Sequence, residues 1–290
     1  MPESPEVQAL VDFLGSRVSG RAIAEVDVLE FRVVKTRTRP PGELVGSSVT
    51  AATRFGKHVD LAVGDAHLGI ALGRHGWARW REAGDADAAS PGATGATADA
   101  PPPALASVTF DDGAVLELTD AGSWVSLGLT VTDDPHEVPA VAKLGADPAD
   151  PAFTEADLDA VVIGRRKQLK ALLQEQESLA GIGNAYSDEI LHLAKISPVS
   201  HAAALTAAEL DRLFDATVGT ITGAIEHQRG VPIDQLKAAK VASMRVHGRA
   251  GETCPVCGDT VLDFSFASTT AQYCPTCQTG GEHLPLRAAE

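Results

Sequence analysis

The four cysteines of this chain form two Cys-x2-Cys pairs separated by sixteen residues, and this spacing constrains the fold more than any other feature. Each pair places two sulfur atoms on one tight turn, and two such turns supply the four thiolates of a tetrahedral zinc site. Because thiolates then fill every ligand position, none remains for a reacting water molecule. The sequence therefore predicts one structural zinc ion, with Cys254, Cys257, Cys274 and Cys277 as its ligands.

Length and hydrophobic content narrow the class of protein. With 290 residues the chain can form two domains and a small module, and its hydrophobic content of 44% is ordinary for a globular protein. No run of about 18 apolar residues occurs, so we expect no membrane-spanning segment. Glu3 and Glu6 stand where a secretory signal would be basic, so we expect a cytoplasmic protein. We also expect a monomer. In that reducing compartment paired cysteines bind metal more often than they form disulfides.

The net charge of −15 is unevenly distributed along the chain. Residues 1–81 carry 11 basic and 9 acidic side chains, residues 82–160 carry 1 and 16, and residues 161–290 carry 12 and 14. A net negative charge by itself argues against a nucleic-acid partner. The acidity is confined to the central stretch, however, and the Debye length is about 8 Å at physiological salt, so a basic surface elsewhere stays compatible with nucleic-acid binding.

Apolar periodicity predicts an α+β chain that begins with a helix at residues 3–18. Short alternating runs, broken by Gly and Asp, then predict a two-layer antiparallel β-sandwich. The Ala-, Gly-, Asp- and Pro-rich segment 84–104 predicts a disordered insert within an N-terminal domain over residues 1–135. The predicted strands are 22–29, 48–54, 58–63, 68–72, 106–110 and 114–118.

Helical periods dominate a second predicted domain at residues 150–243. Its first helix begins at Thr154-x-x-Asp157, which is a capping pattern. The cysteine pairs belong to a third part, a zinc finger over residues 245–285. The further predicted helices are 166–178, 184–194, 206–228 and 233–242.

The second residue of the chain is proline, and removal of Met1 would expose its secondary amine. An α-amine has a pKa near about 8, so a sizeable fraction is neutral at neutral pH and can attack an aldehyde-level carbon to form a Schiff base. The adjacent Glu3 could supply acid–base chemistry. The alternative is that Pro2 and Glu3 only begin the first helix, where both residue types are favoured.

Two further segments combine a tight turn with a polar side chain. Lys57 lies in the sequence RFGKH between two predicted strands, where it could contact a phosphate or remain a solvated turn lysine. Asn184 follows the sequence GIG and opens a predicted helix, whose backbone amides and positive dipole end suit a phosphate. Asn184 could equally be a helix cap alone.

In this order the segments resemble the formamidopyrimidine-DNA glycosylase/endonuclease VIII family of base-excision repair enzymes. The resemblance covers nearly the whole chain apart from the insert 84–104. It implies an N-terminal helix on a two-layer β-sandwich, a helix–two-turn–helix domain and a C-terminal zinc finger, with damaged DNA as the partner. The matching segments are MPESPEV, RFGKHVDL, LKALLQEQESLAGIGNAYSDEIL and VHGRAGETCPVCG followed by QYCPTCQ.

The resemblance also implies a role for each matching residue. Pro2 would be the Schiff-base nucleophile, Glu3 its acid–base partner, and Lys57 a contact to DNA that assists at the sugar. Lys170 and Asn184 would hold phosphates. In the implied mechanism the damaged nucleotide leaves the base stack, the amine attacks C1′, the base departs, and β- and δ-elimination cut the strand.

Several positions depart from the family pattern. Thr269 stands where relatives carry an arginine in the zinc-finger hairpin, and Arg74, followed by His75, stands where relatives insert a methionine into the space left by the flipped base. Trp124 matches the wedge that stacks in DNA, or it belongs to the core. These departures leave the preferred lesion open among oxidised purines, ring-opened purines, oxidised pyrimidines and larger adducts.

Two functions follow from the resemblance. Pro2 and Glu3 favour a bifunctional DNA glycosylase and DNA-(apurinic or apyrimidinic site) lyase, since a pure binding protein needs neither. Thr269 and the altered wedge favour a non-catalytic protein of the same fold that binds damaged or abasic DNA. A zinc-stabilised protein without a nucleic-acid role is supported only by the net acidity. The sequence favours the enzyme.

Overall fold

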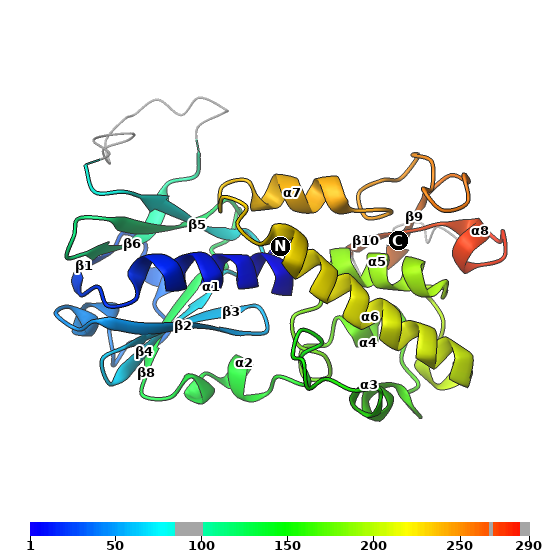
Figure 1. The fold of residues 1–290 in the computed structure, drawn as a ribbon, viewed down its shortest axis with the longest axis horizontal. Coiled ribbons are helices and arrows are strands. Elements are labelled where there is room, and N and C mark those ends of the chain that lie inside the picture. The colour runs from blue at the N-terminus through cyan, green and yellow to red at the C-terminus, as the bar shows by residue number, and fades with distance from the viewer. Residues whose placement is uncertain (85–100, 267–268, 285–290) are drawn as a thin grey trace. The chain divides into compact units, whose positions relative to one another are not determined.

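A computed structural model describes residues 1–84, 101–266 and 269–284 (Figure 1). Most of the insert predicted as disordered, residues 85–100, lies outside the described residues. The chain divides into two compact units, which we call the sandwich unit and the helical unit. The sandwich unit comprises Met1–Pro2, Val7–Ala142 and Pro232–Asp234, and the helical unit comprises Glu3–Glu6, Lys143–Val231 and Gln235–Glu290.

Two four-stranded antiparallel sheets form the sandwich unit. Along the strands, buried apolar side chains alternate with more exposed ones. In β6, for example, Ala106, Val108 and Phe110 are buried. This architecture confirms the predicted β-sandwich. One sheet has the order β1 (Ile23–Val28), β6 (Ala104–Phe110), β7 (Val115–Asp120), β5 (Gly76–Arg81), and the other β2 (Val49–Phe55), β3 (His58–Val63), β4 (Ala66–Ala71), β8 (Gly128–Thr132).

The first helix, α1 (Ser4–Val18), packs against this sandwich with one apolar stripe. The ring of Phe13 meets Trp80 of β5 edge to face, with 5.8 Å between ring centroids. A Cβ at Gly15 would lie 3.9 Å from that of Ala52 in β2, so helix and strand approach closely. The buried stripe consists of Val7, Leu10, Val11, Leu14 and Val18.

Helices dominate the helical unit, and its core consists mainly of buried leucines, isoleucines and alanines from four of its five main helices and the segments between them. The best-defined start is at Thr206, which forms a reciprocal capping box with Glu209 at the head of α6. Two short pieces, α2 (Pro139–Ala142) and α8 (Pro275–Gln278), lie elsewhere in the chain. The main helices are α3 (Glu155–Val162), α4 (Leu169–Leu173), α5 (Asn184–Ala194), α6 (Ala207–Gln228) and α7 (Leu236–Ser243).

The predicted helix at 166–178 is wrong in length, because α4 covers only Leu169–Leu173. After it, the Gln176 side chain donates to the Ile182 carbonyl and accepts from the Gly181 amide. These side-chain bonds replace the helical ladder with a compact turn. The turn delivers the chain to the start of α5.

The C-terminal part of the helical unit carries the cysteine pairs. Between them, β9 (Leu262–Phe266) and β10 (Thr269–Tyr273) form an antiparallel hairpin. The side chain of Thr269 lies outside the described residues. Among the helices of the described ranges, none is both long enough and apolar enough to span a membrane.

Candidate functional site

The carboxylate of Glu3 lies at the N-terminus of α5 and accepts three backbone N–H groups there. The amides of Gly183 and Tyr186 donate to Oε2, and the amide of Ala185 donates to Oε1 at 3.1 Å. These amides have no partner inside the helix, and the positive end of the helix dipole favours an anion beside them. From the sequence these amides suit a phosphate, but the anion that accepts from them in the structure is the protein's own carboxylate.

Glycine at position 183 makes room for this arrangement. A Cβ on Gly183 would lie 2.6 Å from Cδ of Glu3 and 2.8 Å from its Oε2, which is closer than side chains approach one another. Glu3 is 1% exposed. The close approach of backbone and carboxylate therefore depends on the missing side chain.

A second carboxylate, Glu6, is buried next to Glu3. Its Oε1 accepts from the hydroxyl of Tyr186 at 2.7 Å and from Nε2 of Gln228 at 2.9 Å, and its Oε2 accepts from the amide of Glu3 at 2.9 Å. Burial, and then the charge of Glu6, raise the pKa of Tyr186 well above its usual range. The phenol therefore stays protonated and acts as a donor that holds Glu6 in place.

Lys240 of α7 links the two carboxylates, and the sequence analysis missed it. Its Nζ lies 3.2 Å from Oε1 of Glu3 and 2.7 Å from Oε2 of Glu6. Nζ also lies 4.6 Å from the ring centroid of Tyr186. Burial works against the charged amine, but the two carboxylates outweigh it, so the pKa of Lys240 is raised. In the sequence, Lys240 lies four residues after the apolar Leu236, and this spacing places both on one face of a helix. Leu236 is fully buried, so this is the inner face of α7.

Lys170, which the family resemblance implies as a phosphate contact, is enclosed in the structure. Its side chain is 0% exposed, and Nζ donates to Asp188 Oδ1 at 2.6 Å, Ser187 Oγ at 2.8 Å and the Asn184 carbonyl at 3.2 Å. An ammonium has three N–H donors, and these three acceptors use all of them. Lys170 therefore fastens the first turns of α5 instead of contacting DNA.

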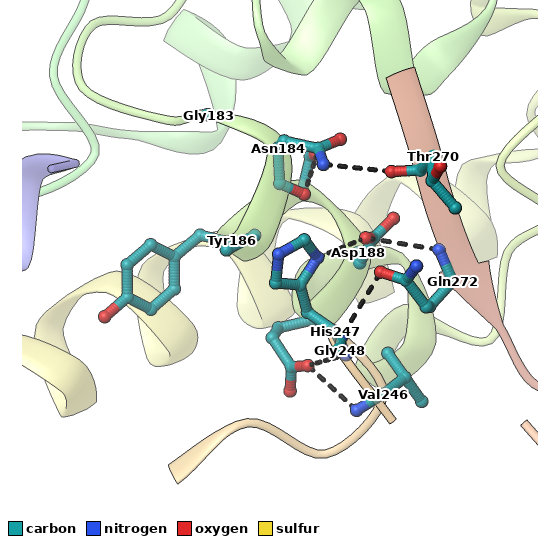
Figure 2. Close-up of polar contacts among 12 residues, drawn as sticks. Gly183, Asn184, Tyr186, Asp188, Val246, His247, Gly248, Thr270 and Gln272 are labelled. Carbon is teal, nitrogen blue, oxygen red and sulfur yellow. Dashed lines mark hydrogen bonds and ion pairs between the residues drawn. The ribbon is translucent and has the colours of Figure 1, made fainter. Parts of the chain in front are cut away.

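Asn184 is half-buried beside the zinc-finger hairpin, and its Nδ2 donates to the Thr270 carbonyl at 3.0 Å (Figure 2). One turn further along α5, Asp188 Oδ2 lies 2.7 Å from Nδ1 of His247 and accepts from the Gln272 amide. Because a carboxylate only accepts, the proton of that imidazole is on Nδ1. The first turns of α5 are thus hydrogen-bonded to the two segments that precede the first and the second cysteine pair.

Lys57 and Pro2 belong to the sandwich unit. Lys57 lies in the turn between β2 and β3, as the sequence predicts, and Nη1 of Arg54 braces that turn by donating to the Gly56 carbonyl at 2.9 Å. Burial, and then the charge of Lys57, lower the pKa of His58. Pro2 is half-buried and directly precedes Glu3.

The loop that carries Trp124 is fixed by a single carboxylate. Oδ2 of Asp120 accepts from the amides of Ser126 and Leu127 and from the Ser126 hydroxyl. The same hydroxyl oxygen accepts from the amide of Arg74 at 3.0 Å. Trp124 is 82% exposed, so the alternative that placed it in the core is wrong.

The Ser126 hydroxyl also joins the two segments of the sandwich unit, around Arg74 and Trp124, that differ from the family pattern. It accepts from the amide of His75 at 3.3 Å, and the side chains of Arg74 and His75 are exposed. An exposed tryptophan, an arginine and an imidazole therefore share one rim of the sandwich unit.

The sulfur atoms of the four cysteines gather within 4.8 Å of one another. Sγ of Cys257 lies 3.3 Å from that of Cys274, and Sγ of Cys254 lies 3.9 Å from that of Cys277. Four thiolates around zinc, each at about 2.3 Å, lie roughly 3.8 Å apart, so the cluster fits such an ion. Nε2 of the buried His192 lies 3.3 Å from Sγ of Cys254, in the position of an outer hydrogen-bond partner.

Comparison with known families divides the chain in the same order. Residues 1–124 match the formamidopyrimidine-DNA glycosylase N-terminal domain, residues 144–234 match the formamidopyrimidine-DNA glycosylase H2TH domain, and residues 251–280 match a zinc finger found in FPG and IleRS.

Two of the following three similar proteins match nearly the full length of this chain, and one matches about half of it. A formamidopyrimidine-DNA glycosylase of Mycolicibacterium gilvum is 32% identical over 298 residues, which cover 96% of this chain and 98% of the relative. An uncharacterized formamidopyrimidine-DNA glycosylase-like protein of Mycobacterium tuberculosis is 45% identical over 149 residues, covering 51% of this chain and 93% of the relative. The solved structure of MutM in complex with DNA containing carbocyclic 8-oxo-G has a TM-score of 0.80 and 26% identity, with 96% of this chain and 100% of that chain covered.

The fold and the site thus define a protein with an N-terminal sandwich, a helix–two-turn–helix domain and a four-cysteine finger. The chain belongs to the formamidopyrimidine-DNA glycosylase family, which confirms the resemblance inferred from the sequence.

Proposed function

We propose that this protein is a base-excision repair DNA glycosylase with AP lyase activity, which removes damaged bases from DNA through a Schiff base on Pro2. The observation that carries this proposal is the Glu3 carboxylate held at the N-terminus of α5, one residue after the N-terminal proline. A carboxylate restrained by three amides and an ammonium is positioned for proton transfer. A protein that only binds DNA could use this carboxylate to cap α5, but it would have no need of an adjacent N-terminal amine.

Pro2 acts as the nucleophile once Met1 has been removed. Its neutral secondary amine attacks C1′ of the damaged nucleotide, and the damaged base leaves with the bonding electron pair. The attached amine then loses its proton, its lone pair expels O4′, which takes up a proton as the C1′–O4′ bond breaks and the sugar ring opens, and an iminium remains between the amine and C1′. The iminium acidifies the C2′ proton, and loss of this proton expels the 3′ phosphate by β-elimination. A second, δ-elimination expels the 5′ phosphate. Glu3 receives and returns protons at the sugar during these steps.

The DNA contacts in this proposal come from both units. Lys57, Arg74 and His75 of the sandwich unit and Asn184 of the helical unit hold phosphates, as phosphate contacts fix a protein on its duplex. Trp124 stacks in the duplex, since an exposed ring on a fixed loop meets the needs of a wedge. One zinc ion, held by the four cysteines, fixes the hairpin near Asn184.

Borohydride trapping tests the proposal. Protein without Met1 is mixed with duplexes that carry an abasic site, 8-oxoguanine, formamidopyrimidine or thymine glycol, and the reduced covalent complexes are counted on a denaturing gel. We expect a complex with the abasic duplex from the unaltered protein and a much weaker one from Pro2→Gly, which keeps an α-amine but lacks the secondary amine of the pyrrolidine ring. Equal trapping by Pro2→Gly would refute the nucleophile.

The second candidate function is damage binding without excision, which Thr269 favours because relatives carry an arginine there. This function predicts that the unaltered protein shifts abasic DNA on a native gel and yields no covalent complex with any duplex of the panel. The same experiment therefore separates the two functions, and the ranking of lesions in it names the preferred base.

A further inference from the structure

Lys240 occupies a position that the chemistry of Pro2 and Glu3 does not by itself explain. Its side chain is 12% exposed, and its Nζ contacts Oε1 of Glu3 and Oε2 of Glu6. Glu3, Glu6 and Lys240 all belong to the helical unit, so these contacts lie within one compact body. Lys237, on the same helix, is exposed.

The two carboxylates need a cation. Both are almost completely buried, and burial of two like charges beside one another costs several kcal/mol per ion unless opposite charge and hydrogen bonds offset it. Backbone amides, a phenol and an amide side chain supply hydrogen bonds to them from neutral donors. The charge of the buried Lys170 also acts on Glu3, although its ammonium is hydrogen-bonded to Asp188. Lys240 brings a full positive charge to both carboxylates at once.

We propose that Lys240 is a positioning residue of the active site, which keeps Glu3 ionised and fixed in the orientation that its proton transfers require. This inference rests on the proposed glycosylase–lyase function. Lys240 acts through Glu3 and forms no bond to the sugar. Its ion pairs join α7 to the two carboxylates, so the correct folding of α7 completes the site.

Lys240 does not replace Pro2 as a nucleophile. Nucleophilic attack requires a neutral amine, and the carboxylates hold Lys240 in the ammonium form. Covalent trapping of DNA should therefore depend on Pro2 even though a second amine lies beside Glu3.

The test is the pH dependence of single-turnover strand cleavage at an abasic duplex, measured for the unaltered protein, Lys240→Gln, Lys240→Arg and the control Lys237→Gln. The control removes the same charge from the exposed side of α7. On the acid side the Pro2 amine, with a pKa near about 8, sets a first break in the profile, and Glu3 sets a second break at lower pH, which is the acid limb compared between variants. Loss of a cation next to Glu3 makes this carboxylate easier to protonate, so this limb of the Lys240→Gln profile should move to higher pH by about 1–3 units. Lys240→Arg keeps the charge and should keep the limb, as should Lys237→Gln.

Each outcome has a defined meaning. An acid limb in Lys240→Gln at the position of the unaltered protein overturns the inference, whatever happens to the maximal rate. Thermal melts of each variant over the same pH range separate partial unfolding from the expected result, because a destabilised variant also loses activity first at acid pH. An unaltered protein that cleaves no abasic duplex refutes the proposed function instead, and so the two failures are distinguishable.

Discussion

Replacement of Gly183 by alanine should disable the site while leaving the fold intact. The new Cβ would lie 2.6 Å from Cδ and 3.0 Å from Cγ of Glu3, whereas ordinary contacts begin at 3.4 Å. The atoms must therefore separate by roughly 1 Å, and the backbone of α5 is less free to move than the carboxylate. Overpacking of this size costs about 1–3 kcal/mol of stability. A misplacement of about 1 Å in a catalytic group costs about a hundredfold in rate.

Single-turnover cleavage of an abasic duplex, together with a thermal melt, measures both effects. The matched control is Gly219→Ala in the middle of α6, where a Cβ meets no atom within 4 Å. This control should retain its activity and gain up to about 1 kcal/mol of stability, since alanine favours a helix over glycine. A cleavage rate for Gly183→Ala within about twofold of the unaltered protein would show that the placement of Glu3 does not limit the reaction.

Four further predictions concern the other parts of the site. Asp120→Asn should release the Trp124 loop and weaken DNA binding in a titration, because an amide cannot accept three donors at one oxygen. Four hydrogen bonds from the loop outweigh burial and lower the pKa of Asp120, so its stabilising effect should be complete above about pH 4 and disappear on further acidification, as a pH series of melts would show. Lys170→Met should cost about 3–5 kcal/mol of stability, because it leaves Asp188 without its main counter-charge, and should not change the salt dependence of DNA binding. Chelation should release one zinc per chain in a metal assay and unfold the segment with the cysteine pairs, whereas full retention of that segment's near-UV circular dichroism would contradict the prediction.

Local patterns were sufficient to predict most of the fold. Helix α6 was predicted to within one residue at its start, since Thr206 and Glu209 form a capping box and the apolar residues follow helical spacing. The sequence does not predict strand β5, because its tryptophans and arginines do not alternate in hydrophobicity. The sequence also does not predict the burial of Lys170, because its neighbours in the chain do not differ from those of a solvent-exposed lysine.

The candidate site itself depends on contacts that no local pattern encodes. The bond between Glu3 and the Gly183 amide joins residues 180 positions apart, and the ion pair of Glu3 with Lys240 joins residues 237 positions apart. The cysteine pairs are the exception, because the two-residue spacing within each pair is enough to predict that both sulfur atoms bind one metal ion. Chemistry that is local in sequence was predicted, and chemistry assembled by tertiary packing required the structure.

The long sequence separation within the Glu3 cluster has a consequence for how the protein is made. The N-terminal amine leaves the ribosome first, whereas the amides that hold Glu3 are synthesised about 180 residues later. At about 5–20 residues per second this delay is roughly 10–40 s, and Lys240 follows later still. On the proposed mechanism, a nascent or truncated chain would therefore carry its nucleophilic amine without an organised partner, and only a chain completed nearly to its end would possess a working centre.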